Sequence, residues 1–239
     1  TSLLARLEYL TRDAAFDRGL GNSPLFLDVP LSRNYGEDFM RIRKEQWTGS
    51  VEFNRSLSED WRLRVGGYWS DVRVPEESFF NYGFPNLSGT AVNRNFVDYR
   101  ERQKDGTAQA ELYGVVRTGA LQHRLLIGLE HNVDRLAFID GRISYGNPID
   151  LYEPTLIGRP DNYEYTGDSR YEFETTALYV QDEISWNRWR VLLGGRQEWT
   201  DTLSFYTGGV DPAVTRSDSP FTPRAGVTFL ATPDLSLYA

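Results

Sequence analysis

The chain contains no cysteine, two histidines and one methionine among its 239 residues. The lack of cysteine excludes disulfide bonds, thiolate metal sites and cysteine nucleophiles, although it fits any cellular compartment. The two histidines, His123 and His131, lie on one expected strand, eight residues apart and therefore about 26 Å from each other. They cannot share a metal ion at that distance, so we expect structural roles for both and no metal site or cofactor in the protein.

Long hydrophobic runs are also missing. The apolar stretches, such as LLIGL at 125–129, are only a few residues long, whereas a membrane-spanning helix needs roughly 20 residues. Any crossing of a membrane must therefore use strands. No basic segment followed by an apolar one opens the chain, so we expect no signal peptide in it. Both ends fall inside patterned strands, which indicates a piece of a longer protein.

Basic residues are fewer than acidic ones, 26 against 34, which gives a net charge of −8 and a pI near 4.9. This balance argues against a nucleic-acid partner. Aromatic residues make up 14% of the chain while the mean hydropathy is −0.50. Apolar mass is thus concentrated in Tyr, Phe and Trp, which suits surfaces that are wet on one side.

The strongest pattern present is the alternation of apolar and polar side chains. In residues 175–206, Leu178, Val180 and Ile184 alternate with polar neighbours, and a short turn at Trp186-Asn187-Arg188 joins this run to a second one. A period of two predicts strands, and the second would span roughly 50 Å, far beyond an ordinary strand. The same pattern predicts nine strands, at 2–10, 45–55, 61–72, 107–117, 123–138, 175–186, 189–206, 220–230 and 235–239.

Short and long connections alternate between these strands without exception. The long segments cover 11–44, 73–104, 139–170 and 207–219. An all-β, antiparallel, up-and-down sheet places all short turns at one end, as transmembrane β-barrels do. Trp61, Trp186 and Trp189 lie beside short turns, whereas Trp69, Trp199 and Tyr206 lie toward the long segments, which matches two interfacial aromatic girdles. A soluble β-sandwich or propeller is the alternative fold, but it favours shorter strands.

The residues alone leave three functions open: a barrel enzyme, a porin, and a protein whose aromatic segment contacts a ligand. A barrel enzyme lacks support because no nucleophile with a nearby base stands out, so we expect no enzyme. The pairs Gly66-Gly67 and Gly194-Gly195 are not phosphate-binding loops, because no Gly-Lys-Ser/Thr follows them. They lie inside strands, where glycine permits bending or close packing. A porin predicts charged constrictions, whereas the long segment at 79–84 is aromatic (FFNYGF). That cluster either packs on itself or contacts a ligand.

Several segments in order resemble the TonB-dependent siderophore receptors of the bacterial outer membrane, in particular the ferrichrome and hydroxamate branch. They are DVPLSRNYG at 28–36, Thr118-Gly119 with HRLLIGLE at 123–130, DLYEP at 150–154, YVQD at 179–182 with LGGR at 193–196, and FTPRAG at 221–226 with PDLSLYA at 233–239. The resemblance covers nearly the whole chain. It identifies residues 1–239 as the middle of a barrel of about 22 strands, without the plug domain and the C-terminal strands.

The resemblance implies an outer-membrane receptor that takes up a ferric siderophore, with outer-membrane lipid and TonB as partners, the latter through a plug that this chain lacks. It also implies aromatic ligand contacts. The family's aromatic pair falls on Phe80 and Tyr82, a further position falls near Phe16, and one more falls between Phe138 and Tyr145. A hydroxamate-wrapped ferric ion presents a mostly organic surface, so aromatic walls with a few hydrogen-bond donors suit it.

Overall fold

The computed structural model of the chain describes residues 1–16, 18–19, 29–30, 32–85, 90–207 and 213–239, without the side chains of residues 82–85. All regular elements of the described residues are β-strands. They are β1 (Ser2–Ala15), β2 (Arg41–Ser56), β3 (Trp61–Pro85), β4 (Ala91–Thr118), β5 (Leu121–Ser144), β6 (Ile149–Asp150), β7 (Glu164–Trp186), β8 (Trp189–Tyr206), β9 (Ala213–Asp218), β10 (Phe221–Thr232) and β11 (Leu235–Tyr238). No helix able to cross a membrane occurs in this part of the chain.

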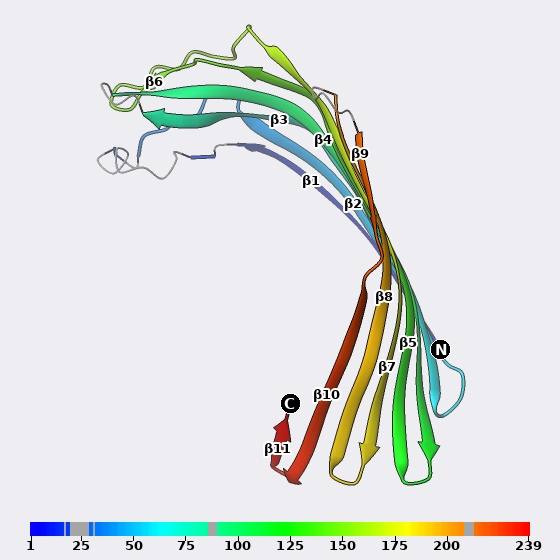
Figure 1. Ribbon diagram of the computed structural model, residues 1–239. Helices are drawn as coiled ribbons and strands as arrows, with labels where there is room; N and C mark the ends of the chain where they lie inside the picture. Colours follow the sequence, from blue (N-terminus) through cyan, green and yellow to red (C-terminus); the bar gives the residue numbers. More distant parts are fainter. Residues whose placement is uncertain (17, 20–28, 31, 86–89, 208–212) are drawn as a thin grey trace.

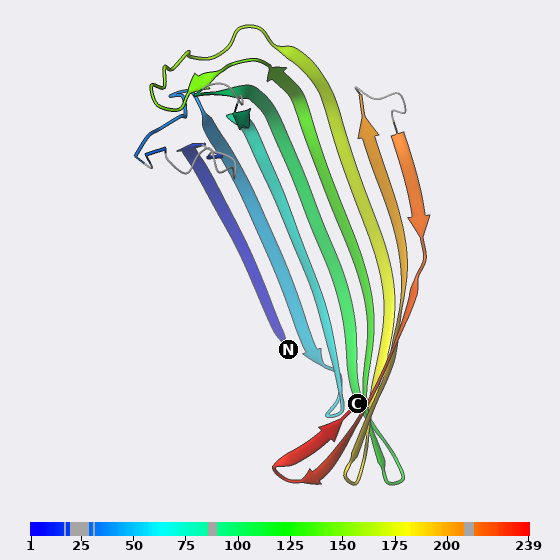
Figure 2. The same ribbon diagram turned by 60° about the vertical axis from the view of Figure 1, so that its left-hand side comes forward.

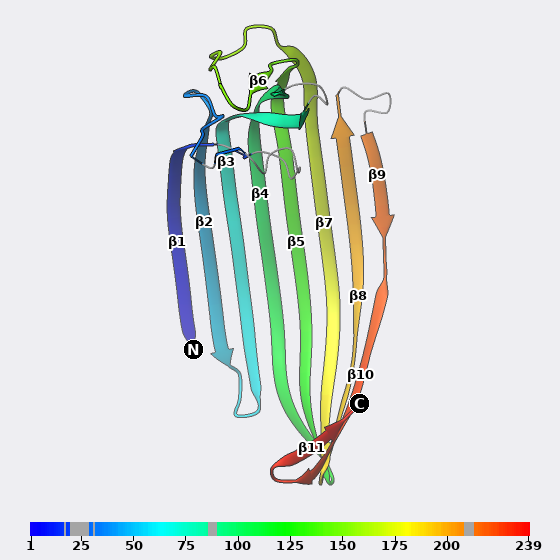
Figure 3. The same ribbon diagram turned by 90° about the vertical axis from the view of Figure 1, so that its left-hand side faces the viewer.

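The strands form one antiparallel, up-and-down sheet, as predicted. Its order is β1-β2-β3-β4-β5-β7-β8-β10-β11, while the short strands β6 and β9 pair with β4 and β8 at its margin. The nine strands in line correspond to the nine expected ones, and the two marginal strands were not foreseen. The sheet curves into part of a barrel wall (Figure 1). Short turns gather at one end and long connections at the other (Figures 2 and 3).

The strands are longer than the sequence pattern predicts. The segment 73–104, expected to be a long loop, is mostly strand, because β3 continues to Pro85 and β4 begins at Ala91. Likewise β5 continues to Ser144 and β7 begins at Glu164. Pro75 suggested a loop, but it lies in a shift of register between Val74 and Glu77. A bulge tolerates proline because the ladder needs no N–H there.

The two faces of the sheet differ in chemistry. One face carries exposed apolar side chains at mid-strand, among them Val51, Val65, Leu129, Leu178 and Leu193. The other face carries ion pairs and hydrogen bonds, some of which cross a whole strand: Tyr179 of β7 reaches over β5 to Glu111 of β4, with 2.9 Å between its hydroxyl and Oε1. In a barrel of this kind the apolar face contacts lipid and the polar face lines a wet lumen.

A row of bulges near the long-loop end interrupts β3 and β5. On β3 one extra residue lies between Val74 and Glu77, and on β5 one extra residue lies between Phe138 and Gly141. The pairings of these strands with β2 and β4 show the same extra residues. Bulges bend strands and increase their twist. Above this row β3 and β4 curve over the concave side of the sheet (Figure 1). Each bulge also moves the following side chains to the opposite face.

The curved end of β3 and β4 is covered by two connections, segment 32–40 and segment 145–163. The largest groups of buried apolar side chains lie here and not between two sheets. One group contains Met40, Phe79, Phe80 and Phe96, and the other contains Val29, Tyr35, Val92, Ile149 and Leu151. The long-loop end is therefore the best-packed part of the described chain.

Candidate functional site

Four aromatic side chains form a continuous row on the lumen side of the long-loop end. The ring centroids of Phe16 and Phe79 are 5.5 Å apart, those of Phe79 and Tyr99 are 6.1 Å apart, and those of Tyr99 and Phe138 are 5.4 Å apart. All three contacts are edge-to-face, a favourable geometry for aromatic rings. Phe138 shares its strand face with Glu130 of the lumen side, because no bulge separates them. We call these four residues the aromatic row.

Polar groups flank the aromatic row. The Tyr99 hydroxyl donates to Glu77 at 2.7 Å, and burial together with this bond raises the pKa of Tyr99 above its usual value. The phenol therefore stays protonated and remains a donor. The guanidinium carbon of Arg18 lies 4.1 Å from the centroid of the Phe79 ring, a cation–π distance. Burial raises the pKa of Glu101, which also lies near Glu77.

The five predicted ligand-contacting residues are divided by the structure. Phe16 and Phe138 belong to the aromatic row, whereas Phe80 lies on the opposite face of β3 and is 0% exposed. Tyr145 is exposed on segment 145–163, and the side chain of Tyr82 lies outside the described residues. A ligand could touch the Phe80 ring only if a covering segment moved. Ligand contact by any of the five residues stays a prediction.

Phe79 and Tyr99 were missed by sequence reasoning. Strict alternation from the inward-facing Val72 and Val74 would turn Phe80 inward. The bulge between Val74 and Glu77 adds one residue, so Glu77 and Phe79 face inward instead. Pro75 was the one local signal for this shift, because proline inside a strand often marks a bulge.

Below the aromatic row the lumen wall is a hydrogen-bonded polar network. Glu111 accepts from the hydroxyls of Tyr113 and Tyr179 at 2.7 and 2.9 Å, and its carboxylate lies 3.4 Å from Arg64. On the same face, Arg196 of β8 forms ion pairs with Glu130 at 2.9 Å and Glu198 at 2.6 Å. These groups offer both donors and acceptors to whatever fills the lumen.

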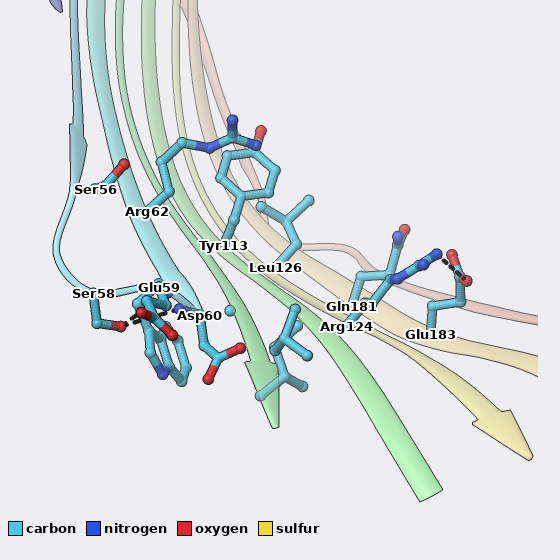
Figure 4. Close-up of a pocket in the computed structure, with 14 residues that line it drawn as sticks. Ser56, Ser58, Glu59, Asp60, Arg62, Tyr113, Arg124, Leu126, Gln181 and Glu183 are labelled. Atoms are coloured by element: carbon cyan, nitrogen blue, oxygen red, sulfur yellow. Dashed lines mark hydrogen bonds and ion pairs between the residues drawn. The ribbon is translucent and has the colours of Figure 1, made fainter. Parts of the chain in front are cut away.

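A groove of about 420 Å³ lies at the other end of the sheet, beside the short turns. Arg62 and Tyr113 lie on one side of it and the ion pair of Arg124 with Glu183 lies on the other (Figure 4). It contains none of the predicted ligand-contacting residues. We therefore do not assign it to the candidate site.

The histidines do not build a metal centre. His123 lies 2.7 Å from Asp182, between Nδ1 and Oδ2, and His131 lies 3.0 Å from the Thr176 hydroxyl. Across the described ranges, no group of three or more His, Asp or Glu side chains is arranged to hold a metal ion.

Comparison with known proteins gives consistent matches. The family model "TonB dependent receptor-like, beta-barrel" matches residues 1–239. The ferrioxamine B receptor of Salmonella typhimurium is 35% identical over 156 residues, which are 65% of this chain and 22% of the relative. The metal-pseudopaline receptor CntO of Pseudomonas aeruginosa is 31% identical over 254 residues, covering 100% of this chain and 35% of the relative.

Solved structures agree on the fold. The siderophore receptor PiuA of Acinetobacter baumannii superposes with a TM-score of 0.82 at 20% identity, over 99% of this chain and 38% of that one. The ferric-catecholate import receptor Fiu of E. coli K12, in its open form, gives a TM-score of 0.76 at 15% identity, over 99% and 43%. This chain spans about a fifth to a third of the length of the two curated relatives. From the family match over all of its residues, the chain belongs to the TonB-dependent receptor-like β-barrel family.

Proposed function

We propose that the receptor containing this chain takes up a ferric siderophore across the bacterial outer membrane, energised by TonB. The observation that carries the proposal is the aromatic row, which faces the lumen at the long-loop end, where a ligand would arrive from outside the cell. The apolar face would contact outer-membrane lipid. Iron would arrive as cargo inside the siderophore, so the protein needs no metal ligands or resident cofactor.

The chemistry of the row suits an organic iron complex. The half-buried rings of Phe16, Tyr99 and Phe138 offer apolar surface to a ligand, with Phe79 packed behind them. The Arg18 guanidinium and the carboxylates of Glu77 and Glu101 supply a few polar contacts. Names of the relatives give two ligand types to compare, ferrioxamine B and metal–pseudopaline complexes. The aromatic row and its few polar groups favour a trihydroxamate such as ferrioxamine B.

Uptake by the whole receptor tests the function. A strain lacking the gene, grown with a single ferric siderophore as its iron source, should fail on one ligand and recover when the gene is restored. Ferrioxamine B, ferrichrome and metal–pseudopaline should be supplied separately. Recovery that does not require TonB would support a porin instead and contradict the proposal.

Binding by purified full-length receptor tests the site. Tyr99→Ala and Phe138→Ala should each weaken binding of the ferric ligand roughly thirtyfold, since truncating an aromatic contact commonly costs about 2 kcal/mol. These two rings are half-buried, whereas Phe79 is 2% exposed and supports them from behind. Tyr145→Ala is the matched comparison, because Tyr145 is an exposed aromatic of the same end outside the row. Loss of affinity in Tyr145→Ala, with both row variants unchanged, would place the ligand on segment 145–163.

A further inference from the structure

A buried ion pair joins three segments that are far apart in the sequence. The side chains of Arg94 on β4 and Glu37 in segment 32–40 are 0% and 2% exposed, with 3.1 Å between Nη2 and Oε1. Arg94 also donates from Nε to the Asn147 carbonyl and from Nη1 to the Tyr35 carbonyl, each at 3.1 Å. Its guanidinium carbon lies 4.2 Å from the Phe80 ring centroid. The arginine is therefore fully engaged.

Glu37 completes the connection to segment 145–163. Its Oε1 accepts the backbone N–H of Ile157 at 3.0 Å, and its Oε2 accepts that of Gly158 at 3.1 Å. Gly158 has a φ of 75°, a left-handed conformation that favours glycine. One carboxylate thus binds a guanidinium on β4 and two amides of a distant connection.

We infer that Glu37 is a latch that holds segment 145–163 closed over the outer face of β3 and β4. Charge-assisted hydrogen bonds are stronger than neutral ones, and a buried charge without its partner is costly. When segment 145–163 lifts, Arg94 and Glu37 lose the Asn147 carbonyl and both amides together. Lifting segment 145–163 therefore leaves both buried charged groups short of hydrogen-bond partners, which favours the closed segment.

The latch determines access to a second group of aromatic rings. Phe80 and Phe96 lie beneath the covering segments and pack against Phe39 of segment 32–40 and Tyr163 of segment 145–163. The ring centroids in contact are 5.3 to 6.1 Å apart. Release of the latch exposes this group to the outside. The inference concerns the free protein and does not depend on the proposed ligand.

The packing of those rings, together with the pairing of β6 with β4, is the competing explanation for the closed segment. Arg159 of segment 145–163 also helps to hold the segment closed, because it forms ion pairs with Glu76 at 3.2 Å and Asp98 at 3.3 Å. These two pairs are partly exposed, however, and exposed ion pairs contribute little. The variants must therefore separate the buried latch from both.

Hydrogen exchange in the full-length receptor, without ligand, tests the latch. The double variant Glu37→Leu with Arg94→Met removes the carboxylate and leaves no buried charge unpaired, so the barrel should still assemble. We expect the amides of Ile157 and Gly158 to exchange about a hundredfold faster or more, while those of Ile127 and Leu129 on β5 keep their rates. Glu76→Gln, the matched control, should change Ile157 and Gly158 little.

Two outcomes would overturn the latch. Wild-type exchange at Ile157 and Gly158 in the double variant would mean that ring packing and the pairing of β6 with β4 hold the segment without the latch. A larger effect of Glu76→Gln than of the double variant would assign the closure to Arg159. The single variant Glu37→Gln leaves the buried Arg94 charge without its carboxylate, so exchange at Ile157 and Gly158 should be at least as fast as in the double variant.

Discussion

At the scale of single residues, a one-residue bulge decides which aromatic side chain faces the lumen. Phe79 and Phe80 are adjacent and chemically identical, yet Phe79 joins the aromatic row while Phe80 stacks beneath Arg94 on the opposite face. The residue types of the site follow from the sequence. Their assignment to a face does not, because alternation is counted from the strand below the bulge.

Asp150 provides a pH-dependent contact at the same end. It accepts the Thr90 hydroxyl and the backbone N–H groups of Glu153 and Tyr152, the latter two at 2.9 and 2.7 Å. These bonds hold the pKa of Asp150 below its usual range. Because the pKa is lowered in the folded state, the ionised Asp150 stabilises the turn at pH values above the usual aspartate pKa of about 4. This stabilisation is lost as the pH falls through the pKa of the folded state.

We therefore expect the amides of Tyr152 and Glu153 to lose protection from hydrogen exchange between about pH 5 and pH 3, after correction for intrinsic rates. The Asp150→Asn variant should be less protected at pH 5 and show no such pH dependence. A wild-type pH response in that variant would assign the effect to another group.

At the scale of elements, β5 carries a close contact that only glycine allows. A Cβ on Gly128 would lie 2.0 Å from Cζ of Tyr179, whose hydroxyl accepts from Gln109 at 2.7 Å and donates to Glu111. Gly128→Ala should displace the tyrosine and lower the free energy of unfolding by about 1–3 kcal/mol, as overpacking does. Urea unfolding of the receptor in lipid vesicles measures this.

Gly66→Ala on β3 is the control for that variant, because the nearest atom to its added Cβ would be 3.6 Å away. It should change the free energy of unfolding by a few tenths of a kcal/mol. Equal losses in the two variants would mean that glycine acts through strand flexibility and not through the space it leaves for Tyr179.

The existence, order and direction of the nine strands in line could be predicted from the sequence, since alternation and turn length are local signals. Strand ends could not. Residues such as Pro75 and Tyr82 read as loop, but a neighbouring strand supplies a ladder that extends β3 to Pro85. The pairing of Glu37 with Arg94 was equally hidden, because the two residues are brought together only by the curvature above the bulges.

At the scale of the whole molecule, the two faces of the sheet should respond oppositely to charge. Leu129 is 51% exposed at mid-strand on the apolar face, at the level of Ala110 and Leu178 on the neighbouring strands. Leu129→Arg should destabilise the folded receptor by about 2–4 kcal/mol, the cost of arginine at the bilayer midplane of a barrel. Gln181→Arg, on the polar face of β7, should cost far less because the lumen is wet.

Folding into lipid vesicles, followed by the mobility shift of folded barrels on unheated gels, compares the two variants directly. The expected difference requires that Leu129 faces hydrocarbon and Gln181 faces water, which is the arrangement of a membrane barrel and not of a soluble sandwich. In a soluble sandwich the exposed Leu129 would tolerate arginine within about 0.5 kcal/mol. Equal folded fractions for Leu129→Arg and Gln181→Arg would therefore contradict a lipid-facing surface for this wall.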